Sequence, residues 1–205
     1  MSVQRIVLAS NNAGKVKEFN ELLKPLAIEV IPQGSLGISS CEEPFPTFVE
    51  NALTKARHAS RLSGLPALAD DSGLCVDALQ GQPGIYSARF AGSASNPKPS
   101  DADNNQHLVE LLGSLTNRLA HFSATIVYIN HPEDPEPLIT HAQWHGEILR
   151  VPQGEAGFGY DPLFYVPELG KTAAELSLAE KNQHSHRAQA LRQLIQALEQ
   201  RLTHA

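Results

Sequence analysis

Residues 5–23, RIVLASNNAGKVKEFNELL, decide the fold class. Residues 5–9 form a short apolar run that reads as a strand, and residues 10–14 are polar. The apolar residues that follow recur at the spacing of one helix face and are Val16, Phe19, Leu22 and Leu23. A strand, a polar loop and a helix in this order predict an α/β protein that starts with a βαβ unit.

The rest of the chain continues this pattern and adds a hairpin. We expect a helix from Thr47, where Thr47-x-x-Glu50 is a capping box and Ala52, Ala56 and Ala59 share a face with Phe48. A buried strand at 65–69 leads directly into Asp70-Asp71-Ser72-Gly73. A loop at 91–100 precedes a helix at 101–112, and 122–129 pairs with 138–149 across a Pro-rich turn. The predicted fold is therefore α/β with mixed strand directions.

The end of the chain is predicted to be helical. Thr172-x-x-Glu175 is a second capping-box candidate. From Ser185 on, a helical face is formed by Leu191, Leu194, Ile195, Leu198 and Leu202.

Composition narrows the class of protein. Residues 1–205 are the length of one domain, or of one domain with two lobes, and the hydrophobic content of 41% suits a globular core. A net charge of −6 argues against nucleic acid as a partner, because binding its backbone needs clustered Lys and Arg. Two cysteines give no disulfide framework, and the first ten residues resemble neither a signal peptide nor a membrane span. We expect a cytoplasmic protein with no membrane partner.

The polar loop at 10–15 is a candidate phosphate site. Backbone N–H groups and the positive end of the helix dipole favour anions at such a position, and Lys15 adds a charge. It is not a Walker A loop, since Val16 stands where that loop has Ser or Thr. An ordinary turn with a surface lysine is the alternative.

Adjacent carboxylates form a candidate metal site. Asp70 and Asp71 repel each other, and Mg²⁺ would resolve this because it takes one or two carboxylates together with phosphate oxygens. The alternative is that Asp71 caps a turn before Ser72-Gly73. Glu42-Glu43 and Lys55, taken alone, read as solvated residues.

A glycine-aromatic stretch, residues 157–162, is a candidate base-binding loop. The glycines around Phe158 allow an unusual backbone that exposes an aromatic face for stacking, or else a tight turn that plugs the core. His186 and Arg187 stand at a predicted helix N-terminus, where their charge opposes the dipole and calls for an acceptor-rich partner. Ser185 could simply be the N-cap of that helix.

These motifs, in this order, resemble the inosine triphosphate pyrophosphatase family, and in particular its bacterial dITP/XTP pyrophosphatase branch. The resembling segments are SNNAGK at 10–15, TFVENA at 47–52 with KA at 55–56, ADDSGL at 69–74, PGIYSAR at 83–89, GFGYDP at 157–162, KTAAEL at 171–176 and SHR at 185–187. The resemblance implies a two-lobed α/β fold with a long mixed sheet, a central cleft and a homodimer. It also implies Mg²⁺-dependent cleavage of dITP, ITP and XTP to a monophosphate and pyrophosphate, which removes them before incorporation into DNA and RNA.

The resemblance further implies a role for each matching residue. The triphosphate would be bound by Ser10, Asn11, Asn12, Ala13, Gly14, Lys15 and Lys55. Mg²⁺ would be held by Glu43, Asp70 and Asp71, and Asp71 would also be the catalytic proton acceptor. Ser72 would contact substrate, and the nucleobase would be bound by Phe158, Gly159, Tyr160, Asp161, Lys181, His186 and Arg187. Ala188 departs from the family's usual glycine, which affects fine specificity and not the reaction.

Two other functions compete with this one. A Maf-type pyrophosphatase would act on pyrimidine or modified nucleotides, and the base-binding segments argue against it. A non-catalytic module would bind inosine nucleotides without cleaving them, and the paired carboxylates argue against that, because mere binding gains nothing from carboxylates opposite phosphates.

Overall fold

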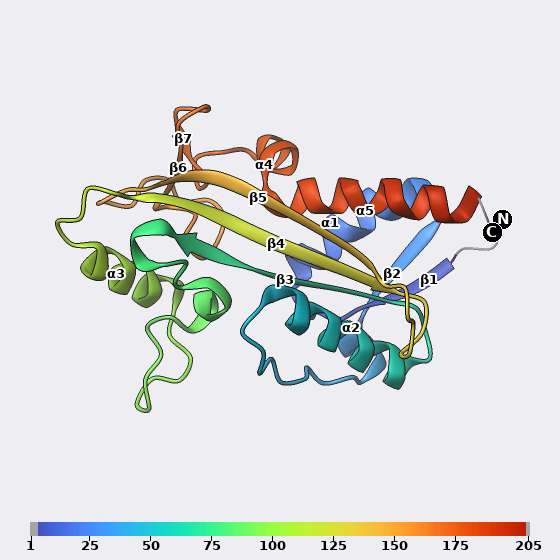
Figure 1. Ribbon diagram of the computed structural model, residues 1–205. Helices are drawn as coiled ribbons and strands as arrows, with labels where there is room; N and C mark the ends of the chain where they lie inside the picture. Colours follow the sequence, from blue (N-terminus) through green and yellow to red (C-terminus); the bar gives the residue numbers. More distant parts are fainter. Residues whose placement is uncertain (1–3, 204–205) are drawn as a thin grey trace. The chain divides into compact units, whose positions relative to one another are not determined.

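The chain forms two compact units. The computed structural model describes residues 4–203 (Figure 1), and residues 1–3 and 204–205 lie outside that description. Unit 1 comprises Met1–Asp71, Ala124–Ala142 and Gln189–Ala205, and unit 2 comprises Ser72–Ser123 and Gln143–Ala188. The chain passes between the units three times inside a strand and once inside a helix, so neither unit is a contiguous segment. That the two units are lobes of a single domain remains a prediction.

The sheet is mixed, as predicted. Its strand order is β2-β1-β3-β4-β5-β6-β7, with β1 parallel to β2 and β3, and with β6 antiparallel to β5 and β7. The strands are β1 (Gln4–Leu8), β2 (Ile28–Pro32), β3 (Ala67–Val76), β4 (Leu119–Ile129), β5 (Leu138–Ile148), β6 (Phe164–Val166) and β7 (Lys171–Thr172). The α/β class and the initial βαβ unit are thereby confirmed.

Most of the helices lie where the apolar periodicity of the sequence predicted them. The α-helices are α1 (Ala13–Leu23), α2 (Phe48–Ser63), α3 (Asp101–Leu112), α4 (Leu178–His184) and α5 (His186–Thr203). The 3₁₀ helices are η1 (Lys24–Leu26), η2 (Gln33–Leu36), η3 (Asp77–Leu79) and η4 (Gly84–Arg89). None of the helices within residues 4–203 has the length and apolar character that a membrane crossing requires.

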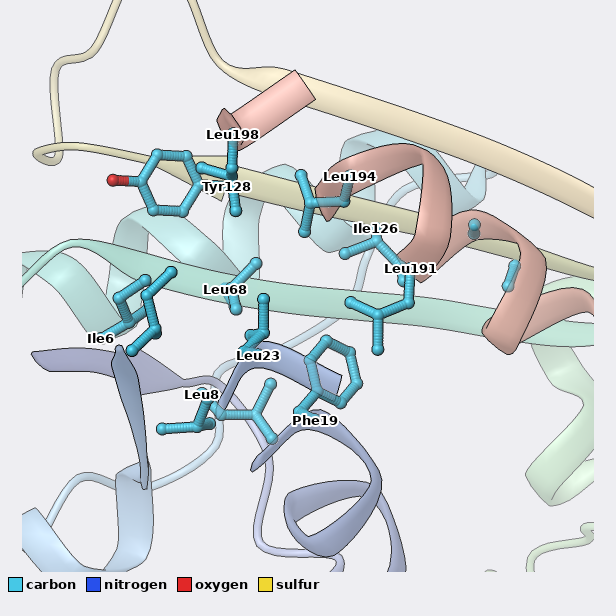
Figure 2. Packing of buried hydrophobic residues seen from close by; sticks show 14 of the residues in the cluster. Ile6, Leu8, Phe19, Leu23, Leu68, Ile126, Tyr128, Leu191, Leu194 and Leu198 are labelled. Carbon is cyan, nitrogen blue, oxygen red and sulfur yellow. The ribbon is translucent and has the colours of Figure 1, made fainter. Parts of the chain in front are cut away.

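Unit 1 is a layered arrangement with helices on both faces of its strands. Successive residues of a strand point to opposite faces, so Ile6 and Leu8 of β1 face one way and Val7 the other. Helices α1 and α5 cover the first face through residues such as Phe19 and Leu194 (Figure 2). The small residues of the opposite face pack against α2 through Ala52, Ala56 and Ala59, as predicted. The side chain of Leu202 lies outside the described part of α5.

Unit 2 has its own core. Helix α3 buries Leu108 and Leu112 in it, together with aromatic side chains from three strands: Phe122, Trp144 and Phe164. The loop predicted at 91–100 is present and leads into α3, whose first turn is held by a capping box between Ser100 and Asp103.

Two predictions about local structure were wrong. The strand predicted at 65–69 continues as β3 to Val76, so Asp70 and Asp71 lie within a strand and not beyond its end. Gly73 does not break the strand: a Cβ there would lie 2.2 Å from the carbonyl oxygen of Gly84, so glycine is needed for close packing.

The second wrong prediction is the capping box at Thr172. The Thr172 N–H does donate to Glu175, at 2.8 Å, but the two residues close a turn after β7. The helix starts later, at Leu178, with a full capping box formed by Ser177 and Glu180. Sequence spacing alone cannot tell a capped helix from a capped turn.

Candidate functional site

The loop at residues 10–15 sits at the N-terminus of α1, where it was predicted to bind phosphate. The Asn12 side chain caps the helix by accepting a hydrogen bond from the Lys15 N–H at 3.1 Å. The loop is anchored further by Asn11, whose Oδ1 accepts from the Gly34 N–H at 2.7 Å. Residues 11–14 are exposed, so the remaining N–H groups at the positive end of the helix dipole can reach an anion.

A cluster of lysines and carboxylates lies in the same unit. Lys15 Nζ donates to both carboxylate oxygens of Asp70, at 3.0 and 2.9 Å. Lys55 Nζ lies 2.8 Å from Asp71 Oδ1 and 3.2 Å from Glu43 Oε1. The two lysines among the predicted phosphate-binding residues are thus paired with the three carboxylates predicted to bind metal. Three carboxylates against two ammonium groups leave one net negative charge.

Burial alters the proton affinity of this cluster. Desolvation raises the pKa of Asp71 above the ordinary aspartate value, although Lys55 opposes this through its charge and its hydrogen bond. Burial works against the charged form of Lys55 as well, but Asp71, Asp70 and Glu43 together raise its pKa. Lys55 is therefore firmly protonated, and Asp71 is a stronger base than a surface aspartate.

The cluster fits a hard divalent cation, provided that phosphate completes the coordination. Asp71 Oδ2 is buried and has no hydrogen-bond partner within residues 4–203, so a strong acceptor remains unmet. In the same part of the chain, no three His, Cys, Asp or Glu side chains form a ready-made metal cage. Mg²⁺ does not need one, because it characteristically binds one or two carboxylates together with water and substrate phosphate.

The residues predicted to bind the base lie in unit 2, and Arg187 is one of the buried ones among them. Its side chain is in the first turn of α5, only 8% exposed, with Nη2 3.3 Å from the Ser72 hydroxyl. His186 beside it stacks on Phe122, with ring centroids 4.9 Å apart and an interplanar angle of 13°. Ser185 accepts a hydrogen bond from the Ala188 N–H at 3.2 Å, so it acts as the N-cap. Ala188 is fully buried.

The glycine-aromatic loop has both of the features that were predicted as alternatives, because one of its aromatic side chains is buried and another is exposed. Tyr160 plugs the core, where its hydroxyl donates to the Ser87 carbonyl at 2.8 Å. Phe158 is instead 55% exposed, with Lys181 Nζ 5.0 Å from its ring centre. Asp161 is buried and holds the loop, because its carboxylate accepts from the Phe158 N–H at 2.9 Å and is ion-paired with Lys181.

Two contacts to this loop have no signal in the sequence. Asp101 and Asn105 on α3 hydrogen-bond the backbone of Gly159, which lies more than fifty residues further along the chain. The helical pattern places both residues on α3 but does not say what that helix contacts.

A hollow of about 430 Å³ in unit 2 is separate from these residues. It is lined by Gln82, Tyr86, Arg89, Phe90, Gly92, Ser93 and Pro97. None of the predicted site residues lines it, so it is not the predicted base pocket.

The fold and the cluster define an α/β protein equipped for an anionic, phosphorylated ligand. The model of the Ham1 family matches residues 6–197, and this chain belongs to that family. It is 61% identical to a dITP/XTP pyrophosphatase of Ralstonia nicotianae, over 96% of this chain and 97% of the relative. It is 56% identical to a dITP/XTP pyrophosphatase of Nitrosomonas europaea, over 98% and 97% of the two chains.

Solved structures agree with this assignment. A HAM1 protein from Coxiella burnetii superposes with a TM-score of 0.90 at 49% identity, covering 96% of this chain and 99% of that one. The Ham1 protein of Staphylococcus aureus superposes with a TM-score of 0.86 at 41% identity, covering 97% and 100%. The family resemblance seen in the motifs is confirmed.

Proposed function

We propose that this chain is a Mg²⁺-dependent pyrophosphatase that cleaves dITP, ITP and XTP to the monophosphate and pyrophosphate. The names of its close relatives support the reaction and the substrate class. The observation that carries the chemistry is the cluster of Lys15, Lys55, Glu43, Asp70 and Asp71, which combines cations for phosphate with a buried, basic carboxylate. Hydrolysis in this way would remove damaged purines from the nucleotide pool.

The reaction requires water to attack the α-phosphorus while pyrophosphate leaves. Asp71 accepts the proton of that water, a role for which its raised pKa suits it. Lys15 and Lys55 exchange their carboxylate partners for phosphate oxygens and stabilise the charge of the leaving pyrophosphate. Asp70, Asp71 and Glu43 would hold Mg²⁺, which when bound neutralises phosphate charge and fixes the phosphate geometry.

Selectivity for the base rests on hydrogen-bond chemistry in unit 2. Inosine and xanthine carry a 6-oxo acceptor, whereas adenine carries a 6-amino donor. Arg187 has only donors to offer, so it matches the oxo group and leaves adenine with donor facing donor. The exposed ring of Phe158 provides a face for stacking.

The rival functions are less well supported. A Maf-type enzyme is not favoured, because the chain belongs to the Ham1 family and its relatives are named for dITP and XTP. A binding module without catalysis would have no use for a buried carboxylate whose pKa is raised above the ordinary aspartate value.

Location and assembly are further parts of the proposal. We expect the enzyme in the cytoplasm, where nucleotide pools are found, with no nucleic acid as a partner because the chain carries a net charge of −6. We also expect a homodimer, which the mass from light scattering would test.

Asp71→Asn tests the proposed chemistry most sharply, because it keeps the shape and removes the base. We expect ITP turnover with Mg²⁺ to fall about a hundredfold or more. Asp77→Asn is the matched control, since Asp77 is an exposed carboxylate six residues along the same segment of chain. Near-normal turnover by Asp71→Asn would contradict the role of Asp71, and activity that persists in chelator would contradict the role of Mg²⁺.

A further inference from the structure

Gly159 is held at both ends of its backbone by one face of α3. Its N–H donates to Asp101 Oδ2 at 2.6 Å, and its carbonyl accepts from Asn105 Nδ2 at 2.8 Å. Asp101 and Asn105 are four residues apart, so they are neighbours on the helix surface. The Asp101 carboxylate is an acceptor and the Asn105 amide is a donor, so at this spacing the two side chains match the backbone N–H and C=O of one residue, Gly159.

The hydrogen bond that Asn105 donates to Gly159 comes with a cost in protein stability. Its Oδ1 is buried and has no hydrogen-bond partner within residues 4–203. An unmet buried acceptor destabilises a protein, so an apolar residue would serve packing alone better at this position. The clearest benefit of the amide is its hydrogen bond to Gly159.

The clamped residue lies beside the exposed aromatic ring of the loop. Phe158 precedes Gly159, and its own N–H is tethered to Asp161. Gly157 and Gly159 have positive φ angles of 84° and 61°, a region open to glycine, so the loop has an unusually wide choice of conformations when it is not tethered. The orientation of Phe158 thus depends on tethers at both sides.

We propose that Asp101 and Asn105 are positioning residues that fix the Phe158 ring in place for the nucleobase. This inference rests on the proposed function, in which the base stacks on Phe158. A loop that must be ordered on binding loses conformational entropy at that moment, and a loop ordered in advance does not. The clamp therefore acts on substrate binding, while the chemistry at the phosphates belongs to residues of unit 1.

Three variants separate positioning from simple stability. Asp101→Ala removes the acceptor, and Asn105→Asp places a carboxylate against the Gly159 carbonyl. Each should raise KM for ITP about tenfold and leave kcat within about twofold. Asp101→Asn retains an acceptor oxygen and should restore KM to within about threefold of the wild-type value.

Asp103→Ala is the matched control for damage to α3. It removes the capping box at the same helix end, where its carboxylate accepts hydrogen bonds from Ser100, and it leaves the two hydrogen bonds to Gly159 in place. We expect it to lower the melting temperature at least as much as Asp101→Ala does, with KM unchanged. An equal rise in KM in Asp103→Ala would overturn the inference, because the effect would then come from helix stability.

Hydrogen exchange gives a second readout that needs no activity. The clamp predicts that the Gly159 amide is protected in the wild type and exchanges at least about tenfold faster in Asp101→Ala. Unchanged protection would overturn the clamp itself. Failure of the wild type to cleave ITP would instead overturn the proposed function, and the exchange result would still report on the contact.

Discussion

Asp71 and Lys55 are ion-paired at 2.8 Å, and yet the pKa of Asp71 is raised above the ordinary value for an aspartate. Burial is the largest influence on the pKa of Asp71 and raises it, Lys55 lowers it through its charge and its hydrogen bond, and the charges of Glu43 and Asp70 raise it again. Lys55 therefore has two roles in the proposed mechanism: it binds phosphate, and it keeps the base ionised at neutral pH.

Replacing Lys55 should shift the pH dependence of the reaction. Lys55→Met removes an influence that lowers the pKa of Asp71, so that pKa should rise further. Because Asp71 must be ionised to accept a proton, the acidic limb of the kcat/KM profile should move to higher pH. Lys17→Met, on the exposed face of α1, should leave the limb in place. A limb that stays or moves to lower pH would contradict this coupling, whatever the overall loss in rate.

Replacing Arg187 should weaken discrimination between bases. Arg187→Ala removes the donors that match a 6-oxo group, so the ratio of kcat/KM for ITP to that for ATP should fall about tenfold to a hundredfold. Steady-state rates on the two triphosphates provide the measurement. Arg192→Ala is a suitable control, since Arg192 is an exposed residue on the same helix. An unchanged ratio would remove Arg187 from base recognition.

Replacing Gly157 should destabilise the glycine-aromatic loop. A Cβ at Gly157 would lie 2.1 Å from Asp161 Oδ2, and its φ of 84° is unfavourable for any residue with a side chain. Gly157→Ala should therefore lower the free energy of unfolding by about 2 kcal/mol or more. At Gly159 the φ is also positive, but no neighbouring atom lies within 4 Å of the place that a Cβ would take. Gly159→Ala should therefore lower the free energy of unfolding by less than Gly157→Ala does. Urea denaturation measures the loss in free energy of unfolding for both variants. Equal losses would show that the clash with Asp161 is unimportant.

Local signals in the sequence predicted most of the fold. The apolar spacing after residue 15 indicated α1, and α3 and α5 begin within a residue of their predicted starts. The extent of β3 escaped prediction because the apolar run ends at Ala69, although the strand continues through Gly73, where glycine allows a close approach to Gly84, eleven residues further along the chain. The capping box predicted at Thr172 was wrong for a related reason, because the same hydrogen bond can close a turn or cap a helix.

The candidate site was predictable as a set of residues but not as a set of contacts. Lys15 and Asp70 are 55 residues apart, and no spacing rule connects them. The repulsion between Asp70 and Asp71 predicts a cation beside them, and in the structure Lys15 and Lys55 supply positive charge there. The case for Mg²⁺ thus rests more on the unmet Asp71 Oδ2 and the residual negative charge than on repulsion.

The bond that is cleaved is the central claim, and ³¹P NMR of the products formed from ITP with Mg²⁺ tests it directly. Attack at the α-phosphorus predicts inosine monophosphate and pyrophosphate in equal amounts, with ATP turned over far more slowly under the same conditions. Inosine diphosphate with inorganic phosphate would place the attack at the γ-phosphorus and contradict the account.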